Sequence, residues 1–158
     1  MKTSAAILKK NPKFADFSAA EMEEFLNYFT KESYSAGDII LREGDKGDKF
    51  CIIAEGEVGI SKDVNEQTCI FLNNLKEGDF FGEMAILTGY PRSANAAAST
   101  EVILLSVSPE GLEKMKTAHP VLFGKFVWIV AKTVSERMYK LEERLSGILS
   151  ASLSENFL

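Results

Sequence analysis

The chain has 158 residues, 46% of them hydrophobic and 26% charged, which is enough for one globular domain with a single core. Its 23 acidic and 18 basic residues give a formal net charge of -5, the wrong sign for a general binder of nucleic acid or anionic membranes. Any anionic ligand must therefore be held by a local site. The apolar runs fall short of the roughly 20 residues that span a bilayer, and the run from Ala5 to Leu8 is too short for a secretory signal. We expect a cytoplasmic protein with no membrane span and no nucleic-acid partner.

The cysteine and histidine content argues against catalysis. Cys51 and Cys69 lie in apolar, strand-like runs without C-x-x-C spacing, which favours buried free thiols over a disulfide or a metal site. The single histidine, His119, precedes Pro120 and is predicted at a junction between helices. Without a second imidazole, metal catalysis and a Ser-His or Cys-His dyad are poorly supported. We therefore expect no enzyme, no metal and no cofactor.

Residues 1–33 are predicted as an N-terminal helical segment. Ser18 and Glu21 form a capping box at the start of a helix. The apolar residues after it recur at helical spacing and predict one buried face: Met22, Phe25, Leu26 and Phe29.

Residues 34–107 consist of short β-rich runs separated by turns. The predicted strands are 39–41, 50–54, 58–60, 68–72 and 102–107, with a polar hairpin tip at 63–67 and a small-residue strand after Arg92. Several turns carry a glycine where a positive φ is expected: Gly37, Gly44, Gly47, Gly56 and Gly78. The pattern predicts an α+β protein that is mainly β. We expect an antiparallel, jelly-roll-like β-roll of about eight strands, with an N-terminal helix and two C-terminal helices.

Residues 108–149 are predicted as the two C-terminal helices, and residues 150–158 as a tail. Ser108 can cap the first helix, Pro109 suits its first position, and it ends near His119. Pro120 opens a longer helix with an apolar stripe of heptad character: Val127, Val130, Val134, Met138, Leu141, Leu145 and Ile148. The stripe can pack on the β-roll alone or form the seam of a homodimer, and both alternatives stay open.

The most unusual stretch runs from Asp79 to Ala94. Gly82 permits close backbone approach, and the turn after it directs unpaired N–H groups outward. Arg92 can return to the same place with a forked, permanently charged donor that suits a phosphate. Glu83 would repel an anion unless it accepted hydrogen bonds from hydroxyl groups, so a sugar is its natural partner. Sugar and phosphate together indicate a nucleotide; the alternative is a surface salt bridge between Glu83 and Arg92.

The order of residues in this stretch is that of a known motif. It reads Phe81-Gly82-Glu83, then the apolar Met84-Ala85-Ile86-Leu87, then Pro91-Arg92-Ser93-Ala94. This resembles the phosphate-binding cassette of the cyclic nucleotide-binding domain family, F-G-E, a short apolar helix and P-R-[AST]-A. Residues 37–40 and 43–50 resemble the family's first strands, and the resemblance covers roughly residues 14–145. It implies one domain over residues 1–158, with the β-roll at 34–107 and the cassette at 81–94.

The resemblance implies a role for each matching residue. Glu83 would accept a hydrogen bond from the ribose 2′-hydroxyl, and Arg92 would hold the exocyclic oxygens of the cyclic phosphate. The backbone near Gly82 and Ala85 would donate to ribose or phosphate. The whole ligand site implied in this way consists of Phe81, Gly82, Glu83, Met84, Ala85, Arg92, Ser93 and Ala94.

Two further features of the ligand site follow from the resemblance. Ser93 stands where the family varies, and serine is the residue of bacterial catabolite activator-like proteins, so cAMP is the first choice of ligand and cGMP the second. In the family, a residue of the last helix covers the base. Here the candidates are Arg137, Met138 and Tyr139, of which Arg137 and Tyr139 could stack on a purine.

The sequence therefore predicts a stand-alone regulatory module in which a bound cyclic nucleotide shifts the C-terminal helices. No helix-turn-helix, kinase-inhibitor sequence or channel helix is recognisable. We expect it to act in trans on an unidentified effector protein or as a homodimer through the C-terminal helix. The alternatives are a degenerate member that serves as a dimerisation or interaction scaffold, and a metal-dependent enzyme on a related β-roll, which a single histidine supports poorly.

Overall fold

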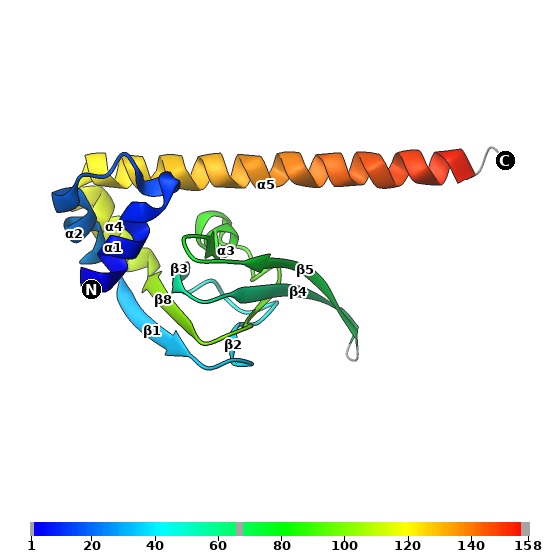
Figure 1. Ribbon diagram of the computed structural model, residues 1–158, viewed down its shortest axis with the longest axis horizontal. Helices are drawn as coiled ribbons and strands as arrows, with labels where there is room; N and C mark the ends of the chain where they lie inside the picture. Colours follow the sequence, from blue (N-terminus) through cyan, green and yellow to red (C-terminus); the bar gives the residue numbers. More distant parts are fainter. Residues whose placement is uncertain (1, 66–67, 156–158) are drawn as a thin grey trace.

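The computed structural model describes residues 2–65 and 68–155, and Figure 1 shows how its helices and strands are arranged. The chain begins with α1 (Lys2–Lys10), the 3-10 helix η1 (Pro12–Phe14) and α2 (Ala19–Leu26). The predicted capping box of Ser18 and Glu21 is present at the start of α2. The helix α1 lies within the predicted helical segment 1–33, but the only individual helix predicted there was the one that begins after Ser18, because α1 has neither a cap signal nor a long apolar stripe. It is held by Leu8, which is 0% exposed against the core.

Eight strands form two antiparallel sheets in the described part of the chain. One sheet has the order β1-β8-β3-β6 and the other β2-β7-β4-β5. The strands are β1 (Thr30–Tyr34), β2 (Ile39–Leu41), β3 (Phe50–Glu55), β4 (Val58–Asn65), β5 (Thr68–Leu75), β6 (Phe80–Phe81), β7 (Asn95–Ala98) and β8 (Val102–Val107). The predicted β-roll is thus confirmed. The polar hairpin tip joins β4 to β5 as predicted, and residues 66–67 of it lie outside the described residues.

The β-roll begins earlier than predicted, because β1 starts at Thr30, inside the segment 1–33 that was assigned to helix. The sequence of β1, Thr-Lys-Glu-Ser-Tyr, is polar. The strand lies at a sheet edge, and none of its five residues is buried. Pairing with β8, from Thr30 opposite Ser106 to Tyr34 opposite Val102, determines the strand instead. Hydrophobic periodicity cannot detect a strand that buries no apolar face.

The predicted positive φ is found at four of the five turn glycines, and Gly47 is the exception. A Cβ built on Gly47 would lie 2.6 Å from the Cβ of Ala85. Glycine is therefore required at this position by close packing of the loop between β2 and β3 against the cassette helix, and not by a turn.

The strand β3 separates two cores. Phe50, Ile52 and Ala54 face the helices, while Cys51 and Ile53 face the interior of the roll. Burial on both faces explains why this strand is continuously apolar. On the helical side, the Phe126 ring of the last helix lies 5.1 Å from that of Phe50, and Phe50 lies 5.1 Å from Phe80 of β6.

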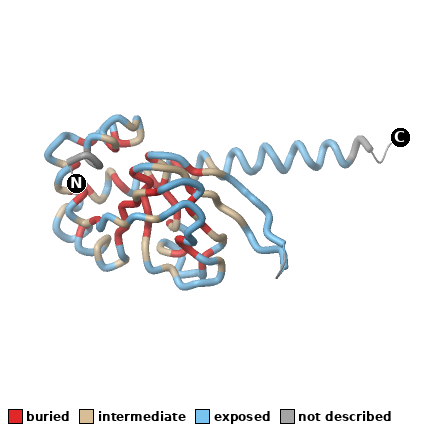
Figure 2. The backbone as a smooth tube through the Cα atoms, turned by 60° about the horizontal axis from the view of Figure 1, so that its bottom comes forward, coloured by how far each residue is buried: buried red, intermediate tan, exposed pale blue. Residues whose placement is uncertain are grey.

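The two cysteines differ in burial. Both are free, and Cys51 is buried as predicted, but Cys69 is exposed. The prediction for Cys69 was wrong because an apolar run does not guarantee a cover: the hairpin of β4 and β5 projects from the roll (Figures 1 and 2). Apolar side chains near Cys69 on β5 are exposed as well: Ile70, Phe71 and Leu72.

Both C-terminal helices are present as predicted, α4 (Pro109–Ala118) and α5 (Pro120–Glu155). Ser108 caps α4 by accepting a hydrogen bond from Gly111 N, and His119 occupies the junction. The second helix continues to Glu155, into the predicted tail at 150–158, because no glycine or proline stops it; residues 156–158 lie outside the described residues.

The apolar stripe of α5 divides into two parts. In its first half Val130 is 7% exposed and Val134 packs partly buried on the core, but Val127 is 41% exposed, contrary to the prediction. Leu122 and Phe126, which lie outside the predicted stripe, are both 4% exposed and supply much of the contact with the core. Figure 2 shows the second half projecting beyond the roll. The stripe residues of this half are 50% to 63% exposed: Met138, Leu141, Leu145 and Ile148. Core packing therefore accounts for Val130 and Val134, but not for Val127 or the second half of the stripe.

Candidate functional site

The predicted cassette forms a strand end, a tight turn and a short helix. Phe80 and Phe81 form β6, Gly82 turns the chain with a φ of 83°, and Glu83 begins α3 (Glu83–Thr88). The left-handed conformation at Gly82 is one that a residue with a Cβ rarely adopts. The turn places the Glu83 side chain in a largely buried position, with 7% of the residue exposed.

The cassette opens onto a pocket of about 440 Å³ between the roll and α5. All eight ligand-site residues predicted from the sequence line it, together with Arg137. Leu41, Ile60 and Leu75 belong to its apolar wall. Small-molecule sites combine an apolar wall with a few placed polar groups, and this pocket has that composition.

Arg92 is held at the pocket by both its backbone and its side chain. Its N–H donates to Asp45 O at 2.8 Å, and its carbonyl accepts from Gly44 N at 2.9 Å. The buried guanidinium donates from Nη1 to Gly82 O at 2.9 Å and from Nη2 to Lys49 O at 2.8 Å. An ion pair with Asp48 at 2.9 Å completes these contacts.

The guanidinium of Arg92 has one hydrogen-bond donor without a partner in the described part of the chain. The residue is 3% exposed, yet its buried Nε has no hydrogen-bond partner among the described residues. Of the three acceptors of the guanidinium, two are backbone carbonyls and one is the carboxylate of Asp48, whose side chain is 73% exposed. A buried cation with an unpaired donor beside a pocket suits an anionic ligand, because a new acceptor would relieve the cost of leaving that donor unpaired.

Glu83 is engaged by the last helix. Its Oε1 accepts from Arg137 Nη1 at 3.2 Å, and Arg137 Nη2 donates to Phe80 O at 2.6 Å. The Arg137 guanidinium also lies over the Phe80 ring, 4.9 Å from its centroid. The salt bridge that the sequence left open between Glu83 and Arg92 does not form; each of the two has other partners.

The three candidates for covering a base have different positions on α5. Arg137 lines the pocket. Tyr139 is 61% exposed and donates to Glu143 at 3.1 Å, and Met138 is 60% exposed. Neither of these two lines the pocket, and which residue covers a base stays a prediction.

Sequence reasoning missed several pocket residues and both anchors of Arg92, Asp48 and Lys49. A sequence pattern could have indicated only two of the missed pocket residues, Asn73 and Asn95. Asn73 interrupts an apolar strand, and Asn95 directly follows the motif. The other lining residues that were missed come from strands of the second sheet: Leu41, Ile60, Lys62, Leu72, Leu75 and Ala96.

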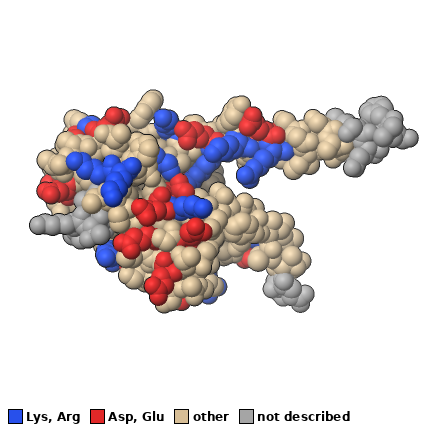
Figure 3. Space-filling model, viewed as in Figure 1, with Lys and Arg blue, Asp and Glu red and all other residues tan. Residues whose placement is uncertain are grey.

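A larger groove of about 530 Å³ lies between the N-terminal segment and α5. Its lysines include Lys13, which is paired with Asp79, and Lys125, which is paired with Glu21. Lys132, which also lines the groove, is exposed. The groove therefore has no buried, incompletely paired cation among the residues that the structure describes, and the cassette pocket is the stronger candidate for a ligand site. On the face in Figure 3, acidic and basic side chains are interspersed, consistent with a locally built anion site.

Fold and site together describe a β-roll domain with a pocket beside a buried arginine whose Nε has no partner within residues 2–65 and 68–155. The sequence profile described as cyclic nucleotide-binding domain matches residues 31–119, more than half of the chain, and the chain belongs to this family. In the described residues, no helix is both long and apolar enough to cross a membrane.

The chain is similar to regulatory and channel proteins. It is 31% identical over 108 residues to a cAMP-dependent protein kinase regulatory subunit of Eremothecium gossypii, covering 68% of this chain and 23% of that protein. It is 32% identical over 126 residues to a cyclic nucleotide-gated potassium channel of Rhizobium etli, covering 80% and 33%. The chain thus spans a third or less of these curated relatives.

A solved structure extends the similarity to the whole fold. The crystal structure of a cyclic nucleotide-binding domain from Methylobacillus flagellatus KT superposes with a TM-score of 0.80 and 26% sequence identity. The match covers 90% of this chain and 80% of that one.

Proposed function

We propose that the chain is a regulatory module that binds a cyclic mononucleotide, cAMP in first place and cGMP in second, in the cassette pocket. The observation that carries the proposal is the convergence of buried Arg92 and buried Glu83 on one cavity. The names of the kinase regulatory subunit and of the gated channel support the ligand class. Glu83 and Arg92 are both present and buried beside the pocket. This gives no support to the alternative of a degenerate, non-binding scaffold.

Each ligand group then has a partner. Arg92 would hold the exocyclic phosphate oxygens with donors that include Nε, and each charge-assisted hydrogen bond would contribute roughly 1.5–3 kcal/mol. Glu83 would accept from the ribose 2′-hydroxyl, and the backbone near Gly82 and Ala85 would donate to phosphate or ribose. The apolar wall, with Ser93 at the rim, would receive the purine.

Binding would be communicated to α5 through Glu83. A ribose hydroxyl that reaches this carboxylate must share it with Arg137 or displace Arg137 from it. Either event changes a contact that holds α5 against the cassette. The ligand therefore has different contacts in two positions of the helix, which is the condition for a population shift, with a coupling of typically about 1–3 kcal/mol.

Calorimetric titration with cAMP and cGMP tests the proposal. Wild type should show saturable binding, and Arg92→Lys should weaken it about 10- to 100-fold, because lysine keeps the charge but loses the fork. Arg144→Lys, on the far half of α5, is the matched control and should bind as wild type does. Absence of saturable binding of both nucleotides would favour the scaffold alternative.

We further propose that the exposed half of α5 pairs in parallel with the same helix of a second copy. The exposed stripe residues Met138, Leu141, Leu145 and Ile148 recur at spacings of three, four and three, which are the a and d positions of a heptad repeat. The double substitution Leu141→Lys and Leu145→Lys should convert a dimer to a monomer in light scattering. A monomeric wild type at micromolar concentration would refute the seam.

The proposal keeps three further parts that the sequence predicts. An effector acting in trans, a cytoplasmic location and the absence of catalysis are expectations from the sequence. They agree with the regulatory class of the relatives' names.

A further inference from the structure

Arg92 depends on the last two residues of one loop. The side chain of Arg92 donates to three acceptors. Two of them, Asp48 Oδ1 and Lys49 O, belong to the residues directly before β3. The Asp48 side chain is 73% exposed and is therefore a weak constraint on Arg92. The carbonyl of Lys49 is a backbone group, so its position is decided by whatever holds Lys49.

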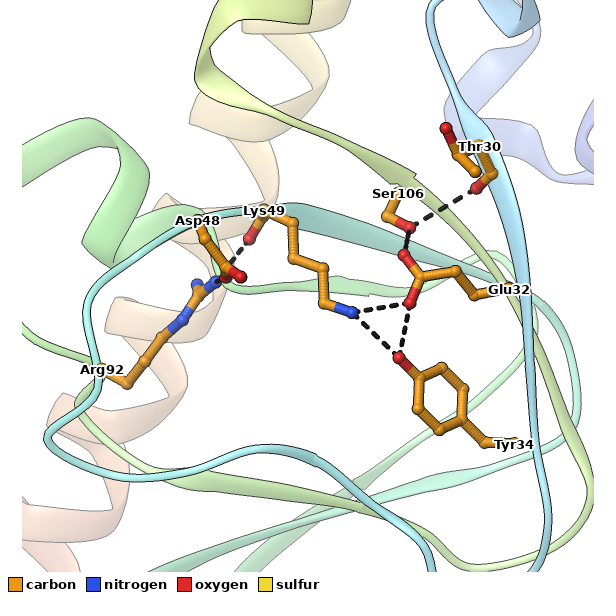
Figure 4. Close-up of polar contacts among 7 residues, drawn as sticks. All are labelled: Thr30, Glu32, Tyr34, Asp48, Lys49, Arg92 and Ser106. Carbon is orange, nitrogen blue, oxygen red and sulfur yellow. Dashed lines mark hydrogen bonds and ion pairs between the residues drawn. The ribbon is translucent and has the colours of Figure 1, made fainter.

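The Lys49 side chain points away from Arg92 toward β1 and β8, as Figure 4 shows. Its Nζ donates to Glu32 Oε2 at 2.7 Å and to the Tyr34 hydroxyl at 2.9 Å. Glu32 also accepts from the hydroxyls of Tyr34 and Ser106. The chain of contacts thus runs from β1 and β8 through Lys49 to the guanidinium of Arg92.

This polar network is partly shielded from water, and each of its members forms at least one hydrogen bond within it. The side chains of Lys49 and Glu32 are 18% and 28% exposed, and Ser106 is 4% exposed. Burial would lower the pKa of Lys49, but hydrogen bonds to Glu32 and Tyr34 outweigh it and raise that pKa. Burial would raise the pKa of Glu32, but hydrogen bonds from Lys49, Ser106 and Tyr34 lower it. Both groups are therefore charged at neutral pH.

None of the network residues lines the cassette pocket, so none of them is placed to touch a ligand there. We propose that Lys49 and Glu32 are positioning residues for Arg92: their ion pair fixes the Lys49 carbonyl and thereby aims the guanidinium into the pocket. The proposal rests on the proposed function of Arg92. It extends the ligand site to β1, a strand that contributes no lining residue.

The test compares Lys49→Met with a matched control, Lys125→Met. Lys125 forms an ion pair of 2.6 Å with Glu21, with side chains 32% and 31% exposed, and has no contact with Arg92. Both variants should lower the midpoint of thermal unfolding. Only Lys49→Met should weaken nucleotide binding, by about tenfold, because coupled residues in one network interact by roughly 1.4 kcal/mol. Lys49→Arg, which can still pair with Glu32, should restore most of the affinity.

A second readout does not depend on the ligand. The ¹⁵N–¹H signal of Arg92 Nε, assigned by its loss in Arg92→Lys, should shift or broaden in Lys49→Met and stay unchanged in Lys125→Met. Unchanged affinity in Lys49→Met would overturn the proposal, whatever its thermal stability. If wild type binds neither nucleotide, the proposed function fails, and the Nε signal alone decides whether Lys49 positions Arg92. If Lys49→Met does not fold, Glu32→Gln decides by the same readouts.

Discussion

Two glycines flank the cassette helix and allow the contact between the turn and Arg92 to be isolated. Gly82 has a φ of 83° and Gly89 has a φ of 74°. A Cβ on Gly82 would lie 2.8 Å from Arg92 Nη1 and 2.9 Å from Lys49 O, whereas a Cβ on Gly89 would meet nothing within 4 Å. Gly82→Ala and Gly89→Ala should therefore cause the same kind of backbone strain, but only Gly82→Ala adds a steric clash with Arg92 and Lys49.

The magnitudes follow from these contacts. A residue with a Cβ in the left-handed region costs roughly 1–2 kcal/mol, and this strain is common to both variants. Gly82→Ala must in addition displace the Arg92 guanidinium from Gly82 O, and a hydrogen bond to a charged group is worth about 1.5–3 kcal/mol. The free energy of unfolding should thus fall by about 1–2 kcal/mol in Gly89→Ala and by about 2.5–5 kcal/mol in Gly82→Ala.

Urea unfolding and nucleotide titration of the two variants supply the assay. The clash moves Arg92, the residue proposed to bind the phosphate. Gly82→Ala should therefore lose at least about tenfold in affinity, equal to about 1.4 kcal/mol, while Gly89→Ala should bind as wild type does. Equal losses of stability in the two variants, with wild-type affinity in both, would refute the reasoning that Gly82 sets the position of Arg92.

Two further predictions concern groups outside the pocket. In the native protein, an aromatic disulfide reagent should modify exposed Cys69 and spare Cys51, because burial raises the pKa of the Cys51 thiol to about 12; equal rates for both thiols would contradict the fold. Hydrogen bonds from Lys125 and the Ser18 backbone lower the pKa of Glu21 from 4.5 to about 2. Its stabilisation is present above pH 4.5 and is lost as the pH falls toward 2, so Glu21→Gln should flatten the pH dependence of urea unfolding there; a curve identical to wild type would contradict this.

The ligand site was predictable from sequence as far as it is local. Phe81, Gly82 and Glu83 are consecutive, and a glycine with positive φ between a strand and a helix is recognisable from the residue types. Arg92 follows within the same stretch. Its partners Asp48 and Lys49 lie 44 and 43 positions away in the sequence, and no local pattern relates a lysine carbonyl to a distant guanidinium.

The remaining correct predictions concern features that local contacts decide, and the wrong or missing ones concern features that contacts between distant residues decide. The capping box at Ser18, the Ser108 cap and most of the turn glycines were predictable, because each is decided by hydrogen bonds or φ angles within a few residues. The strand β1, the exposure of Cys69 and the pairing of Glu83 with Arg137 were not.

The sequence by itself thus determined the family's cassette, most of the turn chemistry and most of the helices and strands from α2 onward, since these depend on neighbours along the chain. Only the tertiary structure decided which half of the α5 stripe is buried, where the β-roll begins and which groups hold Arg92 and Glu83. The physical reason is that burial and ion pairing depend on which distant segments come together. That choice minimises the free energy of the whole domain, and no single segment encodes it.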